Sequence, residues 1–248
     1  MSEISLKRSI VFAVANGKGG VGKSTSAFNL AAFCHHEKKL NVLLLDTEKH
    51  KGVSDVVYAG DKQPGLRFDI RYTFDKDSLA DDVDMYLGRY DVIVIDTAGV
   101  GVDIKSDVSD SAQEAMNEEV LYLADFVVIP LRPAPLDARK TIKFTGMLRK
   151  FQKARRGSSL GAAAFLSEVR KAENLSKMVI EQLQFGIDQN YVHLLKNHIR
   201  YSPKVAEAMG YGLSPLEYTK SHWVQNDIRA VCSEIFDLAV AHQNKEGH

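Results

Sequence analysis

Five short and almost continuously apolar segments constrain the fold of this chain more than any other feature. They occupy residues 10–15, 42–45, 92–95, 126–129 and 162–166. Stretches with the periodicity of amphipathic helices lie between or after them, at residues 24–36, 111–124, 137–153 and 226–241. Because a strand that is apolar on both faces needs cover on both sides, we expect a doubly wound, mostly parallel α/β sheet with helices on both faces.

The composition agrees with this expectation and excludes several other classes. Of 248 residues, 45% are hydrophobic and 26% are charged, which is typical of globular proteins and not of disordered or fibrous ones. We expect one domain over residues 1–248. Cys34 and Cys232 lack the spacing of a disulfide or zinc motif, so reduced thiols are expected. No apolar run approaches the ~18 residues of a membrane span, and none resembles a secretory signal, so we expect a cytoplasmic protein.

The segment after the first expected strand has the pattern of a phosphate-binding loop. It reads Gly17-Lys18-Gly19-Gly20-Val21-Gly22-Lys23-Ser24, which satisfies G-x-x-x-x-G-K-[ST] between a strand and a helix. Glycines let the backbone turn its N–H groups toward phosphate oxygens, and the N-terminal end of the next helix adds positive potential. We expect these residues and Thr25 to bind a nucleotide, with Lys23 on its phosphates and Ser24 on Mg²⁺.

Lys18 is a second lysine in this loop, where a nucleotide site needs only Lys23. Because it precedes two glycines, it cannot easily fold back on to its own nucleotide, but it can reach phosphates held by a facing subunit. A solvated loop lysine is the alternative. Here the chain resembles the deviant Walker A family, K-G-G-x-G-K-[ST], which includes ParA partition ATPases, MinD-type positioning ATPases and the nitrogenase iron protein. The resemblance implies a homodimer that forms on ATP binding, with Lys18 acting across its interface.

Acidic residues follow the second expected strand. Partition ATPases usually show D-x-D-P-Q at this place, whereas this chain has Asp46, then Glu48, and Lys49-His50 instead of Pro-Gln. A carboxylate here can orient the attacking water or hold hydrated Mg²⁺. The longer Glu48 side chain predicts hydrolysis that is slow or differently triggered, and a solvated loop acid is the alternative for this residue.

Asp96 ends the third expected strand, as a Walker B aspartate does. We expect it to hold Mg²⁺ with Ser24 and Asp46. The following residues up to Gly99 resemble the family's second switch segment, in which Gly99 swings toward the γ-phosphate. Residues 127–137 resemble its proline-containing loop near the nucleotide and the dimer face, with a rigid turn as the alternative. The lack of an N-K-x-D or T-K-x-D motif favours adenine over guanine.

Charge is unevenly distributed although the net charge is zero. Residues 46–125 carry 8 basic and 19 acidic groups, whereas residues 126–229 carry 17 and 8. On the helix at residues 137–153, one face gathers Arg139, Lys143, Lys150 and Lys153. This face could bind DNA phosphates without reading bases, together with the nearby Arg149, Arg155 and Arg156. A second basic cluster, Lys196, Arg200 and Lys204, offers the same possibility. A solvated helix face is the alternative, and the acidic segment 103–119 is either a partner site or a solvated loop.

The resemblance implies a Mg²⁺-dependent ATPase similar to small ParF-like partition ATPases without an N-terminal DNA-binding domain. Its ATP-bound dimer would bind nonspecific DNA of the nucleoid, and a centromere-binding adaptor would stimulate slow hydrolysis and so move a plasmid. The expected catalytic residues are Lys18, Lys23, Asp46, Glu48 and Asp96. The main alternative is a MinD-like or conjugation-accessory ATPase that positions a protein assembly. A redox role like that of the iron protein needs a pair of cysteines beside a switch segment, which this chain lacks. A metabolic kinase is a further alternative. Residues 236–248 contain no basic membrane anchor of the MinD kind.

Overall fold

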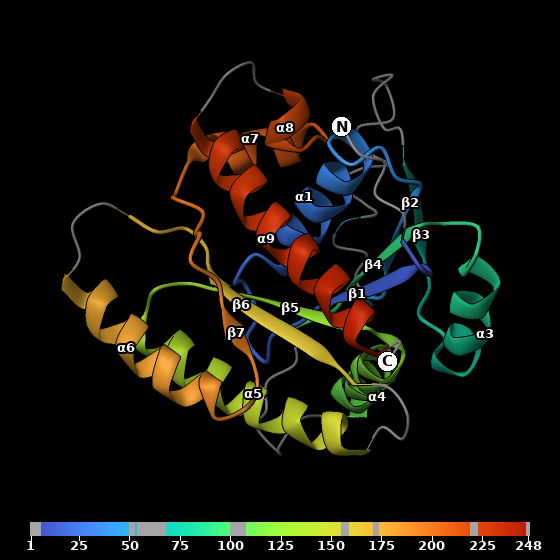
Figure 1. The fold of residues 1–248 in the computed structure, drawn as a ribbon, viewed down its shortest axis with the longest axis horizontal. Helices are drawn as coiled ribbons and strands as arrows, with labels where there is room; N and C mark the ends of the chain where they lie inside the picture. Colours follow the sequence, from blue (N-terminus) through green and yellow to red (C-terminus); the bar gives the residue numbers. More distant parts are fainter. Residues whose placement is uncertain are drawn as a thin grey trace.

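The chain folds into a parallel sheet that carries helices on both faces (Figure 1). This computed structural model describes residues 6–49, 53, 68–99, 108–154, 159–170, 174–218 and 223–246. The sheet has seven strands in the order β3-β2-β4-β1-β5-β6-β7, and all neighbouring pairs are parallel. The expected doubly wound α/β fold is confirmed.

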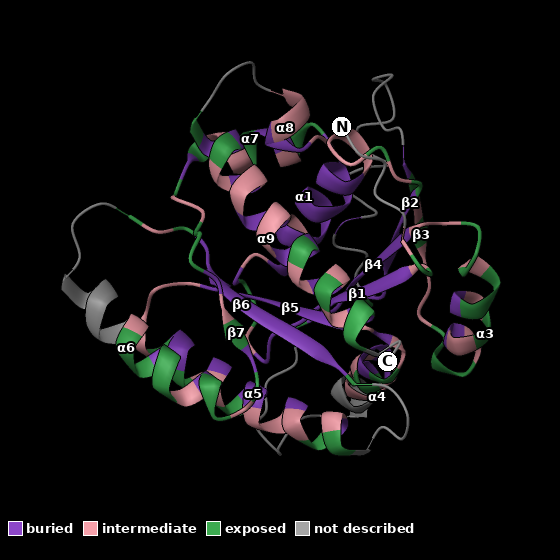
Figure 2. Cartoon of the chain, in the orientation of Figure 1, coloured by how far each residue is buried: buried purple, intermediate pink, exposed green. Residues whose placement is uncertain are grey.

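All five expected strands are present. They are β1 (Ile10–Val14), β2 (Val42–Asp46), β4 (Val92–Asp96), β5 (Phe126–Leu131) and β6 (Gly161–Leu166). Every residue in them is buried, as Figure 2 shows for the centre of the sheet. The edge strands β3 (Asp69–Tyr72) and β7 (His193–Leu194) are only partly buried and were not expected from the apolar pattern.

The four expected helices are also present. They are α1 (Lys23–His36), α4 (Val108–Leu123), α5 (Pro135–Ala154) and α9 (Trp223–Glu246). They are longer than their apolar patterns by between one residue, in α1, and eight residues, in α9. Among the described residues, four further helices were not expected: α3 (Lys76–Tyr86), α6 (Asn174–Asp188), α7 (Pro203–Gly210) and α8 (Pro215–Tyr218). Within the described part of the chain, no helix combines the length and apolarity needed to cross a bilayer.

The core has two layers, one on each side of the sheet. Alternate residues of β1 point to opposite layers: Phe12 packs with residues of α1 and α9, and Ala13 packs with residues of α3, α4, α5 and α6. Figure 1 shows the same division, with α1 and α9 on one side of the strands and α4, α5 and α6 on the other.

The parallel arrangement brings the sequence motifs to one edge of the sheet. Val14, Asp46 and Asp96 end three adjacent strands, and Asp96 is the register partner of both other residues. The segments that leave these strands therefore start side by side, which is the arrangement that places a ligand beyond the carboxyl ends of the strands.

Candidate nucleotide-binding site

The phosphate loop owes its shape to two glycines in left-handed backbone conformation. Gly20 has φ 71° and Gly22 has φ 87°, values that strain residues with a side chain. Gly22 is the N-cap of α1, and the first turn of that helix contains no acidic residue. The N-terminal end of the helix therefore faces the loop, and no acidic residue in its first turn reduces its positive potential.

Lys23 lies buried at the start of α1, only 7% exposed. Its ammonium donates a hydrogen bond to the backbone oxygen of Lys18 at 3.2 Å, so the side chain runs back along the loop. Burial lowers the pKa of this ammonium, while the charges of Asp96 and Glu48 oppose that change. The site thus places one cation beside the loop backbone and within range of two acidic residues.

Asp96 has the properties of a cation ligand. It is fully buried, and neither carboxylate oxygen has a hydrogen-bond partner among the described residues. The net pKa of Asp96 is raised to about 8, chiefly by burial and also by the charge of Asp46, although the nearby Ser24 hydroxyl lowers it. Because an unpartnered buried carboxylate is costly, a cation shared with Ser24 would stabilise it, and these residues fit the expected Mg²⁺.

Asp96→Asn is expected to stabilise the chain in the absence of ligand and to remove its stabilisation by Mg²⁺ with nucleotide. The pKa of Asp96 is about 8 in the folded state and 3.8 ordinarily, so between these pH values the unfolded chain ionises more readily than the folded one. The wild type therefore loses stability as the pH rises from about 4 toward 8, and the Asn variant does not. Melting in EDTA at neutral pH should show a gain of about 2 °C or more. Asp84→Asn, on the exposed surface of α3, is the control. A gain that does not grow with pH contradicts this account.

The segment after β2 places Glu48 near the loop. The backbone N–H of Glu48 donates to Oδ1 of Asp46 at 3.0 Å, and Glu48 itself is only partly exposed. Its charge acts on both Lys23 and Asp96. Glu48 is therefore part of the electrostatic environment of the site, which does not favour the alternative of a fully solvated loop acid. His50 lies outside the described residues.

Gly99, in the segment after β4, lies against the phosphate loop. A Cβ atom at this position would lie 2.6 Å from Cα of Gly19 and 2.7 Å from Nζ of Lys23. Only glycine permits this approach without displacement of one of the two segments. The expected second switch segment is therefore in contact with the loop.

Lys18 is held within its own chain. Its ammonium forms an ion pair with Asp137, at the start of α5, and that carboxylate is only 4% exposed. Asn16 fixes the base of the loop, because its amide donates to the backbone oxygen of Pro130 at 2.9 Å and to the Thr141 hydroxyl at 3.0 Å. Lys18 is thus a partnered side chain at the rim of the site, which argues against a freely solvated loop lysine.

Arg132 also lies beside the loop. Its Nη2 atom is 3.6 Å from where a Cβ of Gly20 would stand, and its Nε atom is 3.4 Å from Oε2 of Glu168. Glu168 itself has a left-handed backbone, with φ 55°. The sequence placed Arg132 in a proline-containing loop near the nucleotide but gave no sign of its pairing with Glu168.

Comparison with known proteins identifies the family. Residues 12–216 match the model of the CobQ/CobB/MinD/ParA nucleotide binding domain. The chain belongs to this family. Nucleotide binding by this member is therefore consistent with both its loop and its family.

The relatives of this family member are named for different functions. Maintenance of carboxysome distribution protein A of Gloeobacter kilaueensis is 36% identical over 130 residues, 51% of each chain. The protein of the same name from Halothiobacillus neapolitanus is 21% identical over 92% of this chain and 97% of its own. Protein ParA of Rhizobium radiobacter is 31% identical over 52% of this chain and 51% of its own. The chain thus spans about half of two of these relatives.

A solved structure supports the fold of the family member. The septum site-determining protein MinD of Pyrococcus horikoshii, complexed with Mg-ADP, has a TM-score of 0.69 at 18% identity. The match covers 93% of this chain and 97% of that one.

The basic residues that we expected to contact DNA lie on the surface of the family member. Arg139, Lys143, Lys150 and Lys153 are all exposed on α5, whereas Phe144, Leu148 and Phe151 are buried. The second cluster is less available, because Arg200 pairs with Asp227 and Lys204 with Glu207. Arg155, Arg156 and residues 103–107 of the acidic segment lie outside the described residues. DNA contact at α5 stays a prediction.

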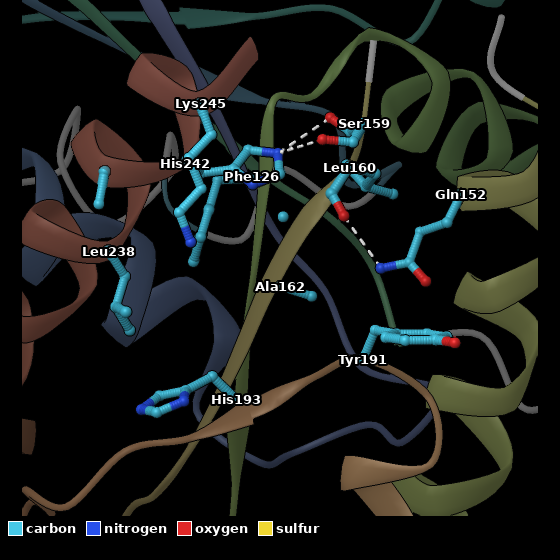
Figure 3. Close-up of a pocket in the computed structure, with 12 residues that line it drawn as sticks. Phe126, Gln152, Ser159, Leu160, Ala162, Tyr191, His193, Leu238, His242 and Lys245 are labelled. Atoms are coloured by element: carbon cyan, nitrogen blue, oxygen red, sulfur yellow. Dashed lines mark hydrogen bonds between the residues drawn. The ribbon is translucent and has the colours of Figure 1, made fainter. Parts of the chain in front are cut away.

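A separate hollow of about 560 Å³ lies at the amino end of β6. Figure 3 shows it between the C-terminal part of α9, with His242 and Lys245, and Gln152 of α5. Its lining includes no residue of the phosphate loop or of the segments after β2 and β4. It is therefore distinct from the nucleotide site of this family member.

Proposed function

We propose that this chain is a Mg²⁺-dependent ATPase that acts as a molecular switch, with an ATP-bound homodimer as its active state. The observation that carries the proposal is the convergence of Lys23, Asp96 and Gly99 on one glycine-rich loop. Two parts of this arrangement support the proposal: the buried Asp96 carboxylate, which has no hydrogen-bond partner among the described residues, and the close approach of Gly99 to the loop.

Each residue of the site has a separate role in the proposed reaction. Lys23 and the backbone of the loop bind the phosphates, while Ser24 and Asp96 hold the metal, with Asp46 next to it. Bound Mg²⁺ would neutralise charge on the phosphates. Glu48 orients the attacking water. Because Glu48 reaches further than the usual aspartate, hydrolysis is slow until a partner adjusts this segment.

Lys18 supplies the dimer-specific interaction. In the proposed dimer its ammonium leaves Asp137 and contacts phosphates bound by the second subunit. The ion pair with Asp137 supports this role, because it keeps a cation at the rim of the site in one defined place. The proposed interface also includes the exposed Gly19 and Gly20 and the 61% exposed Leu136 beside this pair.

The proposed cargo is a plasmid or similar replicon, recruited through a centromere-binding adaptor while the dimer holds nonspecific DNA of the nucleoid. Relatedness to Protein ParA of Rhizobium radiobacter supports this choice. A second candidate is the positioning of a protein assembly. Two relatives named for carboxysome distribution favour it. The ATPase switch is the same in both, and the cargo differs.

Charge reversal on α5 tests the DNA-binding part of the proposal. The double variant Lys143→Glu and Lys150→Glu is expected to weaken ATP-dependent DNA retention at least about tenfold in low salt, because phosphate contacts dominate nonspecific affinity. Sequence-independent DNA fragments, with ATP or ADP and over a salt series, provide the measurement. Glu substitution of Lys76, on α3, and Lys39, after α1, both exposed and outside α5, is the control. Equal retention by the variant and the wild type contradicts a DNA surface on α5, and no retention by the wild type favours protein cargo.

A further inference from the structure

A pair of amide side chains on α4 joins the segment after β2 to the segment after β4. Gln113 accepts a hydrogen bond from the backbone N–H of Lys49 at 3.0 Å and donates one to the backbone oxygen of Thr47 at 3.1 Å. It also donates to Oδ1 of Asn117 at 3.2 Å, and Nδ2 of Asn117 donates to the backbone oxygen of Ala98 at 3.0 Å. The two side chains therefore form one continuous chain of hydrogen bonds between these backbones.

Gln113 holds the turn that carries Glu48 by hydrogen bonds on both sides of that residue. Its Nε2 donates to the residue before Glu48 and its Oε1 accepts from the residue after it, so one side chain fixes both flanks of that turn. Gln113 is 7% exposed, which limits competition from water. Reversal of its amide would bring a donor to the N–H of Lys49, so the contacts also fix its orientation.

At the other end, Asn117 holds the backbone immediately before Gly99. Gly99 in turn lies against Gly19 and Lys23 of the phosphate loop. A continuous path of contacts therefore runs from the loop through Gly99, Ala98, Asn117 and Gln113 to the turn that carries Glu48. The sheet provides a shorter link at the start of these segments, because the backbone N–H and the hydroxyl of Thr47 donate to the backbone oxygen of Asp96 at 3.1 and 2.7 Å. The two amides extend the connection to Lys49 on one side and to Ala98 on the other.

We propose that Gln113 and Asn117 are positioning residues that make the segments around Glu48 and Gly99 move as one unit. A change at Gly99 on nucleotide binding is then transmitted to Glu48 by these two amides. The catalytic consequence rests on the proposed ATPase function, whereas the mechanical coupling does not. Neither side chain carries a charge, so the coupling acts through geometry and persists in high salt.

Two substitutions interrupt this chain of hydrogen bonds at different points. Asn117→Asp keeps the shape and the acceptor for Gln113 but removes the donor to Ala98. Gln113→Met keeps the length and removes every hydrogen bond of that side chain. Gln184→Met, on the exposed surface of α6, is the matched control for the second change.

Hydrogen exchange of the ligand-free chain tests the coupling directly. We expect Asn117→Asp to speed exchange of the Lys49 amide, which Asn117 does not touch, by about fivefold, and Gln113→Met to speed exchange at residues 97–99, because coupling between two sites is reciprocal. Effects confined to the segment that each side chain touches would overturn the proposal. Unchanged exchange in both segments would do so as well.

Steady-state hydrolysis tests the catalytic consequence. Each variant is expected to lower kcat about tenfold and leave KM within about twofold, because substrate contacts remain intact. The double variant should be no slower than Gln113→Met alone, since both changes interrupt one chain of contacts. Additive losses, or a rise in KM with unchanged kcat, contradict the proposal. If the wild type does not hydrolyse ATP, the proposed function fails, and the exchange experiment still decides the coupling.

Discussion

Lys18→Ala is expected to abolish ATP-dependent self-association and to lower turnover on the order of a hundredfold or more, in the range seen when one stabilising donor is removed from an active site. Nucleotide binding by the single chain should persist, because Lys23 and the loop backbone remain. Sedimentation and hydrolysis, each measured in saturating Mg-ATP and Mg-ADP, provide the readout. Lys76→Ala, a change at an exposed lysine of α3, is the control.

The ion pair with Asp137 complicates this experiment in a way that a second variant resolves. Removal of Lys18 leaves a carboxylate that is 4% exposed without its cation, and that alone costs stability. The double variant Lys18→Ala and Asp137→Asn removes both charges. It should recover thermal stability and remain monomeric and slow in ATP. If the double variant recovers self-association as well, Lys18 serves only the fold.

The central fold was predictable because its signals are local. Each central strand is a short apolar run because burial on both faces disfavours polar residues, and the buried acids Asp46 and Asp96 stand only at the carboxyl ends. The short edge strand β3 escapes this logic because alternate residues remain exposed. The unexpected helix α3 carried a signal that our apolar pattern did not include, since Asp75 accepts a hydrogen bond from the N–H of Asp77 as its N-cap.

The contacts within the site were predictable only where a motif encodes them. Lys23 and Asp96 belong to patterns with fixed chemistry, so their roles could be expected from the chain alone. The partner of Lys18 is 119 residues away in the sequence, and the two backbone partners of Gln113 are 64 and 66 residues away. Asp137, Gln113 and Asn117 belong to no sequence pattern with fixed chemistry. Only the packing of α4 and α5 against the sheet shows which of their neighbours they meet.

Gly99→Ala is expected to reduce affinity for ATP by about a hundredfold or more, which corresponds to about 3 kcal/mol. The added Cβ would stand 2.6 Å from Cα of Gly19, which is closer than such atoms approach. The Lys23 ammonium, at 2.7 Å, can turn away, but the Gly19 backbone cannot move without a change in the phosphate loop. Since Gly99 does not have a left-handed backbone, the effect is steric contact and not a lost backbone conformation.

Gly146→Ala distinguishes this local effect from a general intolerance of glycine substitution. Gly146 lies in α5, and the nearest atom to an added Cβ is Nδ2 of Asn190 at 4.0 Å. That variant should bind ATP normally and gain about 0.5–1 kcal/mol of stability, as alanine does in helices. Titration with ATP and ADP, beside thermal melts, compares the two variants. Wild-type ATP affinity in Gly99→Ala would mean that the two segments separate freely, and then no signal could pass from the phosphate loop to Glu48 through Gly99.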